Sequence, residues 1–157
     1  MSHIAKVELQ VMDLAALQEA AEKLGGEYLP NEKSWRWYGR FMNDYSGQDA
    51  AYRHGIKPER YGTADAGIIR FAKATYDIGV YRVPGEDGKY CLVFDNWQNG
   101  QGLETICGKN LAGLKERYGA TVSTKMLVAK GFKVREERDQ QTKRLRLVAT
   151  RGGLAVK

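Results

Sequence analysis

The chain has few of the residues that build metal sites and disulfide frameworks: among its 157 residues are 2 Cys and 2 His. Cys91 and Cys107 each stand in an apolar setting, whereas a structural zinc site needs four ligands. His3 and His54 are the only histidines that could complete such a set, and neither has a chelating spacing. We therefore expect two buried thiols in a reducing compartment, with no metal and no cofactor.

The sequence also lacks a long hydrophobic run. No apolar stretch approaches the roughly 18 residues that a membrane span requires, and the first residues do not have the pattern of a signal or transit peptide. A hydrophobic content of 43% is enough for a core. We expect a cytoplasmic protein (in the host cytoplasm if a phage encodes it), without a membrane partner. We expect one domain over residues 1–150 and a loose tail at 151–157.

Acidic residues are scarce in the last third of the chain. Residues 109–157 contain 13 Lys/Arg and 4 Asp/Glu, a local balance of +9, whereas residues 1–108 contain 12 and 15, a balance of −3. The net charge of +6 therefore combines an acidic front with a strongly basic end. Such asymmetry indicates an anionic partner, which is nucleic acid, a nucleotide or an acidic protein surface.

Periodicity predicts how the first half folds. Residues 3–11 alternate between apolar and polar, which predicts a half-buried strand. Asp13 can cap the amphipathic helix that follows, and Gly25 can end it. Further strands are expected around residues 35–41, in an aromatic-rich insert that spans about 30–62, and at 68–73.

The second half begins with strands at 76–83 and 89–94, joined by a turn at 84–88, and a brief strand at 103–107. Asn110 can cap a second helix, and Gly131 can end it. Its expected apolar stripe is Leu111, Leu114, Tyr118, Val122 and Met126. Residues 132–137 and 144–150 close the fold as a hairpin. The element order predicts an α+β fold: one antiparallel sheet of about six or seven strands with two helices on one face, ferredoxin-like or a duplicated βαββ arrangement.

Several short motifs resemble a known family. They are Ser2-His3 with the strand and helix up to Gly25, Ala64-Asp65 leading to Tyr76-Asp77-Ile78-Gly79-Val80, residues 90–97, Gly108-Lys109-Asn110 and Lys130-Gly131-Phe132. The family has no assigned function and is known in red-algal plastids as a hypothetical chloroplast open reading frame, with relatives in cyanobacteria, other bacteria and tailed phages. The resemblance spans most of the chain except about 30–62. It implies the fold and a cytosolic or phage origin, but no mechanism; a phage origin would favour an accessory or anti-defence role.

The closing hairpin carries the main candidate site. Its apolar residues alternate with basic ones, so that one face packs inward and the other presents a row of cations: Lys133, Arg135, Arg144 and Arg146. Such a row can follow phosphates, with an affinity that depends on salt. The alternative is an ordinary solvated face that Glu137 partly neutralises. Lys109, at the start of the second helix, is a further candidate anion-binding residue, although capping by Asn110 accounts for the same motif.

A second candidate lies in the aromatic insert, where aromatic residues alternate with arginine: Trp35, Arg36, Trp37, Tyr38 and Arg40. This composition suits base stacking combined with phosphate contacts. It equally suits a protein interface, in which Trp, Tyr and Arg dominate the binding energy. The third interpretation is that Trp35 and Trp37 pack into the core.

Acidic residues on or beside strands form the last candidate: Asp65, Asp77, Asp95 and Glu104. Asp77 and Asp95, with His3 or His54, could serve a metal-assisted enzyme, or they could tie loops by hydrogen bonds. The chain has no P-loop and no nucleophile elbow. We therefore expect a non-enzymatic module for an anionic partner. The alternatives are a phage anti-defence inhibitor that acts by protein–protein contact and the metal-assisted enzyme.

Overall fold

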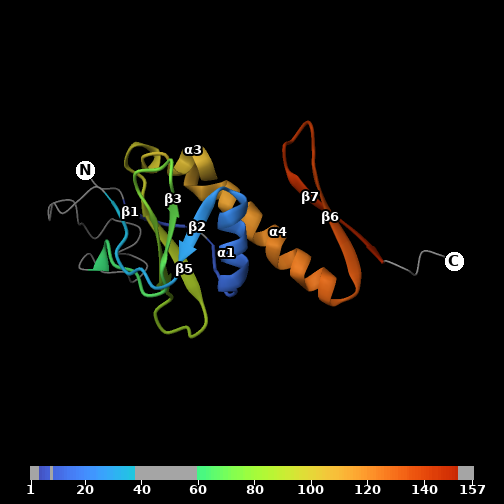
Figure 1. Cartoon of the computed structure of the whole chain (residues 1–157), viewed down its shortest axis with the longest axis horizontal. Helices are drawn as coiled ribbons and strands as arrows, with labels where there is room; N and C mark the ends of the chain where they lie inside the picture. The colour runs from blue at the N-terminus through green and yellow to red at the C-terminus, as the bar shows by residue number, and fades with distance from the viewer. Residues whose placement is uncertain (1–3, 8, 38–59, 152–157) are drawn as a thin grey trace.

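The computed structural model describes residues 4–7, 9–37 and 60–151. Its strands form a five-stranded antiparallel sheet of order β1-β5-β4-β3-β2 and a separate two-stranded sheet, β6-β7 (Figure 1). The strands are β1 (Ile4–Lys6), β2 (Gly26–Leu29), β3 (Ile68–Phe71), β4 (Ile78–Arg82), β5 (Tyr90–Asp95), β6 (Phe132–Arg138) and β7 (Leu145–Arg151). The helices are α1 (Leu14–Lys23), α3 (Leu103–Cys107), α4 (Ala112–Ala129) and the 3-10 turns η3 (Trp97–Gly100) and η4 (Lys109–Leu111). The predicted α+β class is confirmed.

The finer topology differs from the single sheet that the sequence predicted. Strands β2 to β5 form a meander, and α1 carries the chain across the sheet so that β1 and β2 lie at opposite edges. This order contains neither a ferredoxin-like arrangement nor a repeated βαββ unit. Helix α4 then leads the chain away from the sheet before β6 begins, so the last two strands pair with each other.

Both faces of the central strands are buried, because alternate residues of β4 and β5 enter two separate cores. On one face Val80, Leu92 and Phe94 pack against α1, α3 and α4. On the other face Tyr81 and Val93 pack against side chains from residues 34–37 and 60–66. The helices therefore lie on one face, as predicted, and residues 34–37 and 60–66, which we call the aromatic segment, pack on the other (Figure 1).

Helix α1 has the ends that its sequence predicts. The Asp13 carboxylate accepts a hydrogen bond from the Ala16 N–H at 3.0 Å, and Gly25 adopts a φ of +89° after the last turn. The Tyr118 hydroxyl on α4 also accepts the N–H groups of Met12 and Asp13, at 3.0 and 3.2 Å. The start of α1 is thereby joined to the middle of α4.

The expected strand at 103–107 is wrong, because these residues form helix α3. Leu103 and Cys107 stand four positions apart and are both fully buried, so they lie on one face of a helical turn. In a strand Glu104 and Ile106 would share the opposite face. The segment resembles a strand in sequence because five residues are too few for periodicity to separate a helical turn from a strand.

Three other boundaries differ from the prediction. The first strand is limited to β1, and Val11 contributes an isolated bridge to Tyr90. Strand β2 directly follows α1 and pairs with β3. Residues 35–37 lie outside strands, although Ser34 bridges to Thr63. The rest of the strand expected near 35–41 lies outside the described residues.

Helix α4 leaves the core along its length. Leu114 and Tyr118 in its first half are buried, whereas Met126 is 54% exposed instead of completing the predicted stripe. Leu111, and not Asn110, is the N-cap residue of α4, and no side chain caps it. The second half of α4 projects beyond the five-stranded sheet and supports the hairpin (Figure 1). Among the described residues, no helix has the length and apolar character to cross a membrane.

Candidate anion-binding surface

The pairing register of the hairpin places four cations on one side. Lys133 pairs with Thr150, Arg135 with Val148, and Glu137 with Arg146. Residues directly opposite each other in an antiparallel pair share a face. Arg144 immediately precedes β7 and, two positions before Arg146, lies on this same face. We call the surface formed by Lys133, Arg135, Arg144 and Arg146 the basic face.

The opposite side of the hairpin is attached to α4 by two glutamates. Glu116 on α4 accepts the Leu145 N–H and an Arg138 guanidinium N–H, both at 3.1 Å. Glu136 on β6 pairs with Arg117 on α4 at 2.8 Å and with Lys23 on α1 at 3.2 Å. These contacts orient the hairpin, so that its basic face points away from α4.

Glu137 is the acidic residue on the basic face itself. Its carboxylate accepts hydrogen bonds from Arg135 and Arg146, whose side chains are 66% and 71% exposed. Hydrogen bonds from Arg146 and Arg135 lower the pKa of Glu137. Two of the four cations are therefore partly neutralised, in the manner expected of a solvated face, but their guanidinium groups remain open to solvent.

The fourth acidic residue after position 108 closes the hairpin tip. The Asp139 carboxylate accepts the N–H groups of Gln141 and Thr142, both at 2.8 Å, and these bonds lower the pKa of Asp139. Lys143 turns the chain with a φ of +63°. All four acidic residues of this region are thus engaged within the molecule. In the described part of the chain, Lys133 and Arg144 have no ion-pair partner.

Lys109 is not part of this surface. It lies in η4, at the junction of α3 and α4, while the hairpin follows the other end of α4 (Figure 1). Asn110 and Leu111 beside it adopt left-handed conformations, and the Asn110 N–H is bonded to the Glu104 carboxylate. The backbone N–H of Asn110, which an anion at this motif would contact, is thus already bonded to a carboxylate of the same chain.

The tryptophans of the aromatic segment belong to the second core. Trp35 is 3% exposed and donates its indole N–H to the Tyr81 hydroxyl at 2.7 Å. That hydroxyl donates in turn to the Arg60 carbonyl, and burial raises the pKa of Tyr81. The Trp37 ring lies 6.1 Å from Trp35 and 6.0 Å from Tyr61, centroid to centroid. Trp35 is therefore not available as a stacking platform.

Arg36 forms an ion pair with Asp77. The fully buried Asp77 carboxylate receives the Arg36 backbone N–H at 2.9 Å, the Arg36 guanidinium at 2.8 Å and the Arg70 guanidinium at 3.0 Å. Burial alone would raise the pKa of Asp77, but the hydrogen bonds from Arg36 and Arg70 outweigh it and lower the pKa. Tyr38 and Arg40, the other predicted contact residues, lie outside the described residues.

The remaining acidic candidates also bind parts of the chain. Asp95 is fully buried and accepts the Trp97 N–H at 2.9 Å. Asp65 pairs with Arg60 and accepts the Arg82 N–H. Within residues 4–7, 9–37 and 60–151, no three His, Cys, Asp or Glu side chains are grouped so that they could hold a metal ion. His3 and His54 are outside these ranges.

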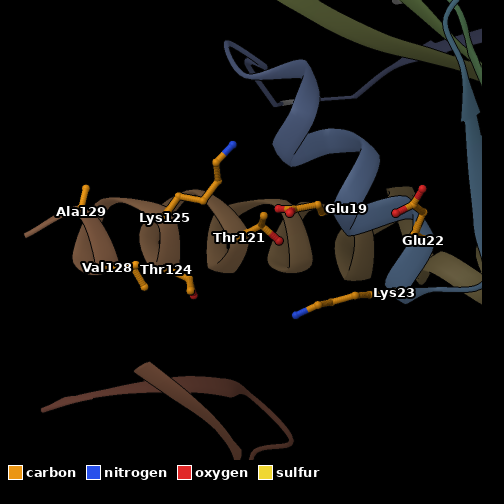
Figure 2. Close-up of a pocket in the computed structure, with 8 residues that line it drawn as sticks. All are labelled: Glu19, Glu22, Lys23, Thr121, Thr124, Lys125, Val128 and Ala129. Atoms are coloured by element: carbon orange, nitrogen blue, oxygen red, sulfur yellow. The ribbon is translucent and has the colours of Figure 1, made fainter. Parts of the chain in front are cut away.

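A groove of about 680 Å³ lies between α1 and α4, beside the hairpin (Figure 2). Thr124 and Val128 point from α4 toward the hairpin, and Lys23 and Lys125 stand at the rim. Both lysines are already paired, Lys23 with Glu136 and Lys125 with Asp13. The groove therefore adds no free cation to the basic face.

Sequence reasoning missed the residues that orient the hairpin, namely Glu116, Glu136 and Arg117. Each belongs to a pair separated by 19 to 29 positions in the chain. Hydrophobic alternation is a property of neighbouring residues and does not reveal such pairs. The indication available in the sequence was that the predicted second helix and the predicted hairpin each contain an acidic residue, Glu116 and Glu136, among many basic ones.

The geometry defines an α+β protein that presents a basic two-stranded ribbon at the end of a helix. Comparison with known families gives a match of residues 46–148 to the family described as "Protein of unknown function (DUF1257)". The match covers more than half of the chain, and the protein belongs to this family. The matched range includes β3 to β6 but excludes β1, α1 and β2, in which part of the resemblance was seen. No curated protein and no solved structure matches the chain.

Proposed function

We propose that the protein is a non-enzymatic binding module that holds nucleic acid on the basic face of its β6–β7 hairpin. The observation that carries the proposal is the imbalance of charge within this part of the chain. The four acidic residues after position 108 are engaged inside the molecule. Among the described residues, Lys133 and Arg144 therefore have no ion-pair partner, and the side chains of Arg135 and Arg146 are largely exposed. Exposed cations in a row attract phosphates chiefly by releasing counterions.

The shape of the surface favours a polymer over a single nucleotide. Three of the cations lie on two strands of seven residues each, which extend over roughly 23 Å, and Arg144 immediately precedes the second strand. Small-molecule sites are concave and enclose most of their ligand. A basic ribbon spread over this length instead suits repeated phosphate contacts, so nucleic acid is the anionic partner that we favour.

The enzyme alternative has less support from the geometry. Asp77 and Asp95 hold backbone N–H groups and arginines of neighbouring segments, which is the role of loop-tying carboxylates. A binding module in the cytoplasm is consistent with the wider set of plastid, cyanobacterial and tailed-phage relatives that the motifs suggest. In a phage the same surface would serve an accessory or anti-defence role, and the neighbouring genes would identify that setting.

The proposal predicts strongly salt-dependent binding. We expect the protein to bind a DNA duplex of about 20 base pairs with log K falling by about 2 to 4 for each tenfold rise in salt, because about 0.9 is lost per phosphate contact. Fluorescence anisotropy with a labelled duplex at several salt concentrations measures this slope. No binding of duplex DNA, duplex RNA or single strands at low salt would contradict the proposal, and a protein pulldown would then test the acidic-protein partner.

Removal of the acid from the basic face should strengthen binding. In Glu137→Gln, Arg135 and Arg146 lose their shared carboxylate partner and gain freedom to contact phosphates. We expect an affinity increase of about tenfold near 100 mM salt and a slope steeper by about one. Asp87→Asn, in the exposed turn between β4 and β5, changes the net charge equally and serves as the control. Equal gains in both variants would show that net charge alone acts.

A further inference from the structure

The hairpin is a ribbon with one open face and two open edges. Strands β6 and β7 pair over seven positions, and within the described residues no third strand joins either edge. Its other face lies against α4, and the ribbon stands apart from the five-stranded sheet (Figure 1). The free surface is therefore narrow, elongated and backed by a helix.

These dimensions match one form of nucleic acid. Two paired strands lie about 4.8 Å apart, and the major groove of B-form DNA, about 12 Å wide, admits a two-stranded ribbon. We infer that the partner is double-stranded DNA and that the hairpin enters its major groove with the basic face toward the bases. This inference rests on the proposed function and adds to it the form of the nucleic acid and the groove.

The placement of charge on the two strands supports this geometry. Lys133 and Arg135 belong to β6, whereas Arg144 and Arg146 belong to the β7 side. A ribbon that lies along the groove has one strand beside each phosphate wall, so each wall would meet two cations. On the same face Val148 of β7 lies opposite Arg135, and an apolar side chain of this kind suits the methyl group of thymine in the major groove.

Other nucleic acids fit the same surface less well. The major groove of an RNA duplex is too deep and narrow for side chains to read, and the minor groove of DNA is about 6 Å wide. Single strands are held by aromatic side chains on which bases stack. The basic face has no aromatic residue, because Phe132 lies on the opposite face, in register with Arg151 and beneath its guanidinium at 4.6 Å.

The test measures binding of the full chain to three nucleic-acid probes of the same sequence, each about 20 nucleotides long per strand. The probes are a DNA duplex, an RNA duplex and single-stranded DNA. Anisotropy at about 100 mM salt should show the DNA duplex bound at least tenfold more tightly than either alternative. RNA or single-stranded DNA bound equally or more tightly would overturn the groove inference and leave the proposed function standing. Absence of binding to all three would overturn both.

A footprint identifies the groove on the DNA duplex. Dimethyl sulfate methylates guanine N7 in the major groove and adenine N3 in the minor groove. Saturating protein should protect guanine N7 and leave adenine N3 reactive, because N7 lies in the groove that we assign to the ribbon. Protection of adenine N3 with reactive guanine N7 would overturn the major-groove placement. A Lys133→Gln/Arg144→Gln double variant should weaken the protection of guanine N7. Unchanged protection in this variant would show that the hairpin is not the part of the protein that lies in the major groove, and would overturn the inference.

Discussion

Replacing all four residues of the basic face with glutamine should lower the affinity for a DNA duplex about a thousandfold near 100 mM salt. Each lost phosphate contact removes about 0.9 from the slope of log K against log salt, so four contacts near 0.1 M approach a factor of 10³ to 10⁴. We expect the lower factor, about 10³, because Glu137 already neutralises part of the charge of Arg135 and Arg146. Anisotropy titrations at several salt concentrations measure both the loss and the smaller slope.

The fold should be retained in this variant, because the four side chains are exposed and the contacts of the hairpin with α4 come from its other face. A matched control changes the same amount of charge on the five-stranded part of the molecule: Lys6→Gln, Lys33→Gln, Lys73→Gln and Lys89→Gln together. We expect the control to lose less than tenfold in affinity. An equal loss in both variants would show that binding depends on the net charge of the protein and not on the basic face of the hairpin.

The elements that the sequence predicted well are those that depend on neighbouring residues. The alternation of β6 and β7 placed Lys133 and Arg146 on one face, because side chains of a strand point alternately to opposite sides. The Asp13 cap and the Gly25 terminus are likewise local. Helix α3 was missed because its single turn is too short for its period to differ from that of a strand.

The aromatic segment could not be assigned from composition. Trp35 would suit a core, a protein interface or a base-stacking site, and its environment depends on Tyr81, 46 positions later. The same holds for Arg36, whose partner Asp77 is 41 positions away. Whether a tryptophan is buried depends on which segment covers the second face of the sheet, and that is a property of the tertiary structure.

Asp77→Ala is expected to lower the free energy of unfolding by about 3 kcal/mol. Removal of one partner from a buried ion pair costs about 3–5 kcal/mol, and the lower value applies because the Arg36 and Arg70 side chains are 48% and 34% exposed and can be hydrated. The change also removes the acceptor of the Arg36 N–H, which holds the Trp35 segment over the sheet. Urea denaturation measures the effect, and Asp87→Ala should stay within about 0.5 kcal/mol of the wild type.

The same carboxylate should contribute to the pH dependence of stability. Its pKa in the folded protein lies below the ordinary value of 3.8, so the unfolded chain binds a proton more readily. The stabilisation from Asp77 is therefore complete above pH 3.8 and is lost as the pH falls toward the lower folded value. Other carboxylates of the chain also have lowered pKa values, so the informative quantity is the difference between the wild type and Asp77→Asn. That difference should shrink on acidification below pH 3.8.

The contacts of Asp77 also distinguish a structural role from a catalytic one. Both carboxylate oxygens accept hydrogen bonds from Arg36 and Arg70, and the lowered pKa keeps the group ionised. A general base must be within reach of the proton that it removes, and here the arginines occupy those positions. Asp77→Asn should therefore destabilise the fold while leaving the salt slope of DNA binding unchanged below its unfolding transition. A changed slope with unchanged stability would contradict this role and connect Asp77 to the bound partner.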